Sequence, residues 1–443
     1  MDCFAVLILS GSFSVTLHQV AHGSPNEFSM STKSIPLSSY QIRLLAVLAL
    51  INFVNFAARQ VFVPLIPLLR DHLHATDTQL GSLQFFLLFV LAIGSYPFGF
   101  FADRFSRKAI IAIGISLWSI ATFVGGFASS FLFFLIARSV VGLGEAAYAP
   151  AAQSMISGAF PQERRAVAQA IFASGMLLGG ACGHVAGGVL GQRYGWQIAL
   201  FVVALAGIVP GIALFRIEEP PRGPRSEVVP FFRLLGVPAF VSMIFAGICI
   251  TFASVSLLTW STDFAVSYKG FSLREASVSL AVIGLLSALL GVLTGGFVAD
   301  RLHRSYSAGR IMAVVAAFLL AAPFLLLAIQ SEEKSTVLIG LSVAFFFMSW
   351  YHGPVTAVLH DMMPRRAHAT SVGIYMLATQ LVGGLGPAVV GKISDLRDLQ
   401  VGLQISVAVL VCGALLMLLV IHFIRRDGIR HSSLDAFHAE PGD

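Results

Sequence analysis

The sequence predicts an all-α membrane protein with twelve transmembrane helices in two six-helix repeats. The first observation is composition: 57% of the residues are hydrophobic and only 11% are charged, whereas a soluble domain carries about 25% charged residues. The second is that several apolar runs exceed the roughly 20 residues that cross a hydrocarbon core about 30 Å thick. These runs are continuous rather than alternating, which excludes a barrel. The third observation is an internal repeat.

Charged, Pro-containing or Gly-containing turns separate the apolar runs. In order, we expect spans at about 44–68, 79–101, 109–127, 131–157, 167–192, 197–215, 237–266, 275–299, 311–329, 335–362, 369–393 and 401–424. The seventh and tenth runs are longer than a perpendicular crossing needs, so we expect them to be tilted or broken.

The distribution of basic residues predicts the orientation. Of the 28 Lys and Arg residues, 19 fall on the side that holds both termini and 7 on the other side, while Arg59 and Arg138 lie within spans. Basic residues collect on cytoplasmic loops. Both termini are therefore expected in the cytoplasm, and the net charge of +6 needs no nucleic-acid partner.

The chain divides at a linker rich in Pro and charge, RIEEPPRGPRSEVVPFFR at 216–233. Residues 1–39 resemble neither a span nor a full signal peptide, and we interpret them as a disordered leader or a mis-assigned start, with Met30 as the other candidate. The expected parts are this leader, an N-terminal six-helix bundle at 40–215, a cytoplasmic linker at 216–236, a C-terminal six-helix bundle at 237–424 and a cytoplasmic tail at 425–443.

The two halves share three motifs in the same order. GFFADRFSR at 99–107 closes the second span, and GFVADRLHR at 296–304 closes the eighth, with six of nine positions identical. PQERRA at 161–166 has a weaker counterpart, PRRA, at 364–367, and GGACGHVAGG at 179–188 corresponds to GGLGPAVVG at 383–391. Two six-span repeats with a substrate site between them near the midplane are the plan of a transporter.

The duplicated GFxADRxxR motif places an acid and several bases at a cytoplasmic helix end. Its small residues let a neighbouring helix approach, and its carboxylate can meet a base or a helix N-terminus. We interpret both copies as gate latches that hold one conformation; the alternative is a solvated charged turn. The gate residues are Asp103, Arg104, Arg107, Asp300, Arg301 and Arg304.

Several motifs resemble known families. GFFADRFSRK, with Ser106 where Gly is usual, and Arg138 followed by GLGEA resemble signatures of the major facilitator superfamily. NFAARQ, ATDTQLGSLQ, LWSIATFVGGFASSF, GWQIALF, LLTWSTDF and GGFVADR are similar to bacterial spinster-type transporters, over about 40–424. The resemblance implies the major facilitator fold, proton coupling, and lysolipid or sphingoid substrates. One position departs from it: Ala58 stands where those proteins have an Asp before the arginine.

An ionisable residue at the centre of a membrane helix costs about 2.5–3.5 kcal/mol on insertion scales, so it usually faces the bundle interior and is functional. Glu145 and Arg138 share the fourth span, and seven residues separate them by about 10 Å along one face. We therefore expect Glu145 to meet Arg59 of the first span, or water, and to exchange protons. The proton-coupling prediction comprises Glu145, Arg59 and Arg138; the alternative is a static ion pair that fixes helix packing.

The substrate-binding prediction includes Arg59, whose permanent charge could receive an anionic head group or could simply neutralise Glu145. His184 could titrate near physiological pH or only bond a neighbouring backbone. Aromatic residues of the second half could line a cavity or serve as packing anchors. The full set is Asn55, Arg59, Tyr148, His184, Thr259, Trp260, Trp350, Tyr351 and His352.

These features predict a proton-linked secondary transporter that moves an amphipathic substrate by alternating access, as a monomer in a bacterial inner membrane. The first alternative is an organic-anion or drug transporter of the same fold, and the second is a membrane sensor, for which we see no output domain. Neither a catalytic triad, a HExxH motif nor a Walker lysine motif is apparent, and the four cysteines show no metal spacing. We therefore expect neither an enzyme nor a cofactor.

Overall fold

The computed structural model describes residues 38–221, 234–363 and 367–426, apart from the side chains of residues 103, 162, 163 and 369. Within these residues all regular elements are helical, and twelve helical segments are long and apolar enough to cross a membrane. The predicted all-α fold with twelve spans is confirmed. The leader, most of the linker and the tail lie outside the described residues, and the proposed domain boundaries stay a prediction.

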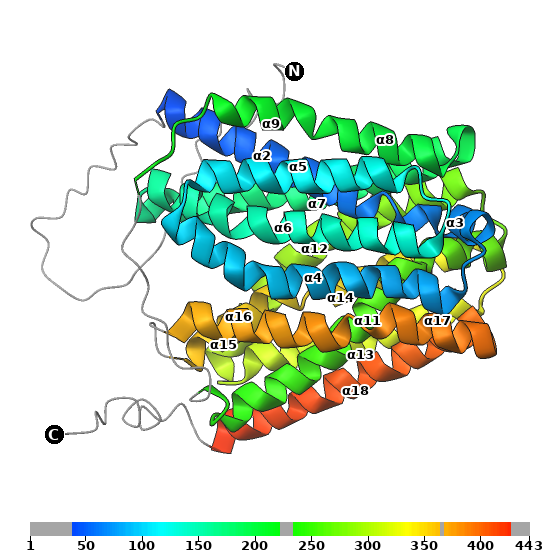
Figure 1. Cartoon of the computed structure of the whole chain (residues 1–443). Coiled ribbons are helices and arrows are strands. Elements are labelled where there is room, and N and C mark those ends of the chain that lie inside the picture. Colours follow the sequence, from blue (N-terminus) through cyan, green and yellow to red (C-terminus); the bar gives the residue numbers. More distant parts are fainter. Residues whose placement is uncertain (1–37, 222–233, 364–366, 427–443) are drawn as a thin grey trace, which may run out of the picture. The chain divides into compact units, whose positions relative to one another are not determined.

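The first six spans form one group of packed helices (Figure 1). Their elements are α2 (Ser39–Gln60), η1 (Val63–Leu65), α3 (Ile66–Leu73), α4 (Asp77–Arg104), α5 (Arg107–Gly125), α6 (Phe131–Ala159), α7 (Gln162–Tyr194), α8 (Trp196–Ala206) and α9 (Ile208–Phe215).

The last six spans form a second group. Its elements are α11 (Pro238–Lys269), α12 (Leu273–Ser305), α13 (Gly309–Gln330), α14 (Lys334–Met348), α15 (His352–Asp361), α16 (His368–Ala378), η3 (Thr379–Gly383), α17 (Gly386–Leu396) and α18 (Leu399–Arg426).

Equivalent helices of the two groups begin in the same way. Thr76 and Gln79 form a capping box at the start of α4, and Ser272 and Glu275 form one at the start of α12. Each box satisfies two of the backbone N–H groups that a helix start leaves without partners. The second and eighth spans therefore begin with the same local chemistry, in addition to ending with the same motif.

Among the described residues, four spans are interrupted within the membrane-spanning length. The first divides after Gln60, the sixth divides at Gly207 between α8 and α9, the tenth divides between α14 and α15, and the eleventh contains the π-helical turn η3. The expected break of the tenth span is present, whereas α11 in the seventh span runs unbroken over 32 residues. Irregular backbone at membrane depth is tolerated only where it is buried in protein or lines a water-filled cavity, so these breaks mark the interior of the bundle.

The two groups meet mainly along α4 and α7 of the first group, with smaller contacts of α11 with η1 and α3. We call the end where α2 begins and α18 finishes the proximal end, and the opposite end the distal end (Figure 1). Helix α4 packs against η3 and α17, and α7 packs against α12. Gly81 lies against the backbone of Pro387 and Gly188 against Ser277, so closely that neither glycine has room for a Cβ atom. Both contacts lie in the distal parts of the helices, where the two groups are joined most closely.

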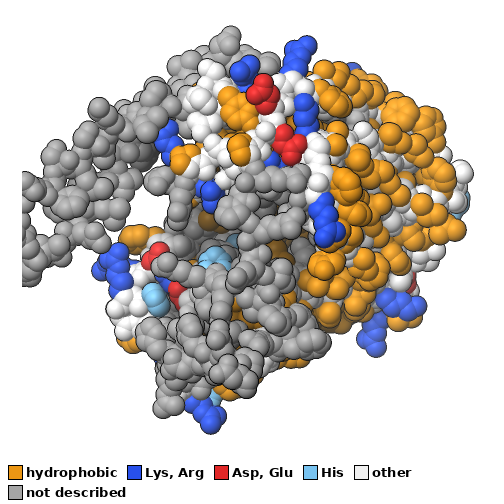
Figure 2. Space-filling model, turned by 60° about the vertical axis from the view of Figure 1, so that its left-hand side comes forward, with side chains coloured by type: hydrophobic (Ala, Val, Ile, Leu, Met, Phe, Trp, Pro, Cys, Tyr) orange, Lys and Arg blue, Asp and Glu red, His pale blue; other side chains and the backbone are white. Residues whose placement is uncertain are grey.

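Apolar side chains cover the lipid-facing flank. Helix α9 exposes Val209 and Phe215, and α12 exposes Leu293 and Phe297, each by more than 60% of its surface. Figure 2, which turns the proximal end forward, shows a broad apolar flank with Lys and Arg side chains at its borders. A soluble monomer rarely exposes an apolar surface of this extent. A membrane protein exposes such a surface to the lipid along its transmembrane helices.

Candidate functional site

The break in the first span is held by a charged side chain from α6. Helix α2 ends at Gln60, and the last carbonyl groups of a helix have no partner within it. Arg138 donates from Nη1 to the carbonyl oxygen of Ala58 at 3.4 Å and from Nη2 to that of Arg59 at 3.3 Å. Its guanidinium also lies 4.2 Å from the ring centroid of Phe62. A positive charge at a helix C-terminus is favourable, so Arg138 caps α2 at its break.

The expected contact between the first and fourth spans is present. Arg59 Nη1 lies 3.4 Å from Glu145 Oε2, and Glu145 is only 3% exposed. The other oxygen of the carboxylate, Oε1, has no hydrogen-bond partner among the described residues. Arg138, in contrast, bonds to the backbone of the first span. The structure thus brings Arg59 and Glu145 together, while the proton-coupling role of this group stays a prediction.

Asn55 lies between the points where α6 contacts α2. The hydroxyl of Tyr148 donates to the carbonyl oxygen of Leu48 at 3.3 Å, and Leu48, Asn55 and Arg59 share one helical face because seven and four residues separate them. Asn55 is 3% exposed, and its Nδ2 has no partner among the described residues. A donor at Asn55 and an acceptor at Glu145 are therefore left free on facing helices, available to water or a substrate.

Two predicted substrate residues connect helices instead. Trp260 on α11 donates from Nε1 to the carbonyl oxygen of Pro387 at 3.0 Å and is fully buried. His184 Nε2 on α7 lies 2.9 Å from Thr262 Oγ1 on α11, so it joins the first group of helices to the second. The structure places both residues in helix contacts, and their role in substrate binding stays a prediction.

The remaining predicted residues lie in α11 and at the break in the tenth span. Thr259 is buried in α11. Trp350 packs on Phe346, with 5.9 Å between ring centroids, and Tyr351 is hydrogen-bonded to Tyr375. His352, the first residue of α15, is exposed. Trp350, Tyr351 and His352 are consecutive in the sequence and therefore lie together at this break.

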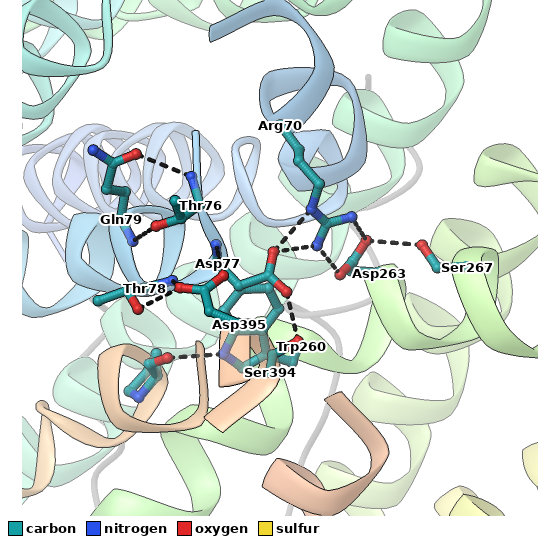
Figure 3. A network of polar contacts seen from close by, with 11 residues as sticks. Arg70, Thr76, Asp77, Thr78, Gln79, Trp260, Asp263, Ser267, Ser394 and Asp395 are labelled. Atoms are coloured by element: carbon teal, nitrogen blue, oxygen red, sulfur yellow. Dashed lines mark hydrogen bonds and ion pairs between the residues drawn. The ribbon is translucent and has the colours of Figure 1, made fainter. Parts of the chain in front are cut away.

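An ionic cluster at the distal end was not predicted from the sequence (Figure 3). Arg70 on α3 makes a paired contact with Asp263 on α11, with Nη1 2.9 Å from Oδ1 and Nη2 2.6 Å from Oδ2. Its Nε also donates to Asp77 Oδ1 at 2.8 Å. Asp263 is completely buried. A bidentate Arg–carboxylate pair is the strong form of such a contact, and this one joins the two groups.

The same cluster includes a helix cap supplied from the other half. Asp395 at the end of α17 accepts hydrogen bonds from the backbone N–H groups of Asp77 at 2.8 Å and Thr78 at 2.9 Å. Ser394 Oγ donates to Asp77 Oδ2 at 2.6 Å. We call Arg70, Asp77, Thr78, Asp263, Ser394 and Asp395 the distal network. An acid at a helix N-terminus satisfies free N–H groups and complements the helix dipole.

At the proximal end, the gate residues of the second half pair within that half. Asp300 lies 3.1 Å from Arg310, which also contacts Asp361 at 2.5 Å. Arg301 and Arg304 are exposed. These contacts link α12, α13 and α15, all within the second group.

The gate residues of the first half contact their own half and the linker. Arg104 lies 3.5 Å above the ring centroid of Phe100. Arg107 is buried and donates to Glu219 at 2.9 Å. Partial burial raises the pKa of the Glu219 carboxyl, but hydrogen bonds from Arg107 and Ser106 outweigh it and hold this pKa below its ordinary value. The side chain of Asp103 lies outside the described residues. The described gate residues thus do not bridge the halves, whereas the distal network does.

Comparison with known proteins decides the family. The model of the Major Facilitator Superfamily matches residues 48–387. The chain belongs to the Major Facilitator Superfamily. It is therefore a multi-pass membrane protein with the fold and family of transporters.

Similar proteins within this superfamily are named for different roles. The chain is 27% identical to an MFS-type efflux pump of Mycolicibacterium smegmatis over 84% of this chain and 88% of that protein. It is 26% identical to protein spinster homolog 1 of Xenopus tropicalis over 88% of this chain and 82% of that protein. It is 24% identical to a hexuronate transporter of Bacillus subtilis over 88% of this chain and 96% of that protein.

A solved structure of a bacterial spinster homologue, in an inward-facing and unoccupied conformation, has the same fold. It superposes with a TM-score of 0.80 and 23% identity, over 88% of this chain and 99% of that one. The predicted superfamily and the similarity to spinster-type transporters are confirmed.

Proposed function

We propose that the protein is a secondary active transporter that moves a small amphipathic substrate across the membrane by alternating access. The observation that carries this proposal is the uneven joining of the two groups of helices. At the distal end Arg70 and Asp395 form ionic or capping contacts across the interface. At the proximal end Arg107 pairs with Glu219 of the linker, and Arg310 pairs within the second half. This is the arrangement of a carrier closed on one side and poised to open on the other.

The excess of basic residues on the terminal side supports a cytoplasmic proximal end. In that orientation the structure corresponds to an inward-facing state, and the distal network is the outer gate. Both termini then lie in the cytoplasm, and the membrane is a bacterial inner membrane. We propose that the transporter works as a monomer, with one path between its two groups of helices.

For the coupling, we propose that Glu145 takes up and releases protons while Arg59 holds either Glu145 or the substrate. The partly unpaired carboxylate in the bundle supports this role, because a buried ionisable residue in a membrane protein usually serves a pathway. When Glu145 is protonated, Arg59 loses its partner and is available to an anionic head group. Release of that proton would return Arg59 to Glu145 and weaken its hold on the substrate.

For the substrate, we propose a lysolipid-like or sphingoid molecule. The similarity to spinster proteins supports this class, as does a central site that holds the charges of Arg59, Arg138 and Glu145 and an aromatic break at Trp350 to His352. The test is uptake into proteoliposomes that contain the purified protein, using lysophospholipids with and without an imposed proton gradient. We expect accumulation that increases with the gradient. Equal uptake in liposomes without protein would contradict the proposal.

The alternative is an organic-anion or drug transporter on the same fold. The similarity to an efflux pump and to a hexuronate transporter supports it. The same proteoliposomes distinguish the two: uronic acids or cationic drugs would be moved, whereas lysolipids would not. A membrane sensor would bind one of these compounds and move none.

A further inference from the structure

The eleventh span is divided next to the interface between the two groups of helices. Helix α16 ends at Ala378, the π-helical turn η3 covers Thr379–Gly383, and α17 begins at Gly386 with a proline as its second residue. Single π-helical turns are found frequently at functional sites. Discontinuous membrane helices likewise supply binding sites in transporters. A break at this position therefore needs an explanation beyond packing.

Helix α4 of the first half runs along this break. Gly81 lies against the backbone of Pro387, and Leu88 Cδ1 lies 3.2 Å from the position that a Cβ atom of Gly384 would take. Gln84 is three residues after Gly81 and four before Leu88, so it lies on the same face of α4. Gln84 is thereby carried to the level of η3, which α4 contacts directly.

Both this glutamine and one in η3 hold a polar atom without a partner. Gln84 is 7% exposed, and its Oε1 is buried without a hydrogen bond among the described residues. Gln380 Oε1, in η3, is buried and unpaired in the same sense. Leaving a buried acceptor unpaired is costly, and two on facing elements at one level indicate a site whose partner comes from outside the protein.

We propose that Gln84 and Gln380 form a neutral polar subsite that binds an uncharged hydroxyl or amide group of the transported molecule. A substrate O–H donates to an amide oxygen, and an amide N–H can donate in return. The inference rests on the proposed transport function and adds to it: the subsite lies between the halves and is separate from the charged pair Arg59–Glu145. The substrate is therefore an amphiphile with a hydroxyl or amide group in addition to any charged head.

The first experiment needs no substrate. Gln84→Leu and Gln380→Leu each remove an unpaired buried amide, so we expect the purified variants to melt at the same temperature as the wild type or at a higher one. Gln404→Leu on α18 is the matched control, because α18 packs against α11, α13 and α17 and has no extensive contact with α4. If the two amides bond each other across the interface, each single variant melts clearly lower than both the wild type and the control, and the proposal is overturned.

The second experiment measures selectivity with two probes, oleoyl lysophosphatidate and its 2-deoxy analogue, which differ by one hydroxyl. We expect the wild type and Gln404→Leu to favour the hydroxyl probe by about fivefold in binding and uptake, as one hydrogen bond provides. Gln84→Leu and Gln380→Leu should lose that preference. A preference that survives in both variants, or is absent from the wild type, overturns the subsite. If the wild type moves neither probe, the proposed substrate class fails instead, and the melting comparison still decides the subsite.

Discussion

Glu145 and Arg138 are both buried charges of α6, yet the structure gives them different surroundings. Glu145 contacts Arg59 through one oxygen and leaves the other without a partner. Arg138 instead supplies hydrogen bonds to the carbonyls of Ala58 and Arg59 at the end of α2. Glu145 therefore has a free oxygen that can take up a proton. Arg138 instead stabilises the break of the first span.

Glu145→Gln should therefore leave the fold intact and flatten the pH dependence of transport. Glutamine keeps the shape and can still accept a hydrogen bond from Arg59, but it cannot exchange a proton. Uptake into proteoliposomes at several pH values measures this, with the melting temperature as the control for folding. A variant whose pH profile matches that of the wild type would remove Glu145 from the coupling mechanism.

Ala58→Asp tests the position at which the chain departs from the transporters that it resembles. Ala58 is 1% exposed, directly before Arg59. A second acid there competes with Glu145 for one guanidinium, and the titrations of the two acids become coupled. We expect more protons moved per substrate and weaker binding of anionic substrate, because Arg59 is partly neutralised. Proton flux and binding are compared at matched protein levels; unchanged values in a folded variant would place Ala58 outside the transport pathway.

At the scale of single elements, the distal start of α4 depends on two caps. Thr76 supplies the local cap within the first half, and Asp395 adds an acid from the second half. The first can be read from the sequence as the pattern Thr-x-x-Gln. The second cannot, because more than 300 residues separate the partners.

Asp395→Ala should cost about 1 kcal/mol of stability in the distally closed state, the usual value of a lost N-cap. Asp395→Asn should cost less, because asparagine also caps helices well. Denaturation of the purified variants in detergent gives the comparison. Equal losses for Ala and Asn would show that charge rather than capping is what Asp395 contributes.

Sequence patterns predicted the spans well and their interruptions poorly. Hydropathy alone sets the length of a membrane helix, and each of the twelve runs is long enough. The break in the first span follows from Gln60 ending α2 ahead of Pro64, a signal that was present but reads equally as a kink. The break in the eleventh covers TQLVGGL at 379–385, of which the repeat motif GGLGPAVVG includes only the last three residues. Arg59 and Glu145 were paired correctly because buried charges seek opposite charges. Gln84 and Gln380 carry no such signal in the sequence.

For the whole molecule, the distal network joins the two halves, and in the proposed transport cycle it determines which conformation is stable. Arg70 and Asp263 come from different halves, 193 residues apart, and would separate if the distal end opened. A difference of 1.4 kcal/mol between the two conformations changes their ratio about tenfold. Losing one bidentate contact is therefore enough to change the resting population.

Arg70→Gln and Asp263→Asn should each shift the population toward the distally open state. The double variant should shift it no further than the stronger single variant, since the two side chains act as one pair. Spin labels at the exposed His74 and Arg397 report the distal separation by pulsed resonance. If the distance distribution is the same in wild type and variants, the distal network is not a gate.

The cap that Asp395 places on α4 also makes two peptide groups into reporters of the transport cycle. While the halves are joined, the N–H groups of Asp77 and Thr78 are held by the carboxylate. Once the halves part, these two groups face water as ordinary ends of a helix. Their hydrogen–deuterium exchange should then proceed only during distal opening. The exchange rate of this short peptide would therefore report how often the resting carrier opens at its distal end, and the measurement needs no attached label.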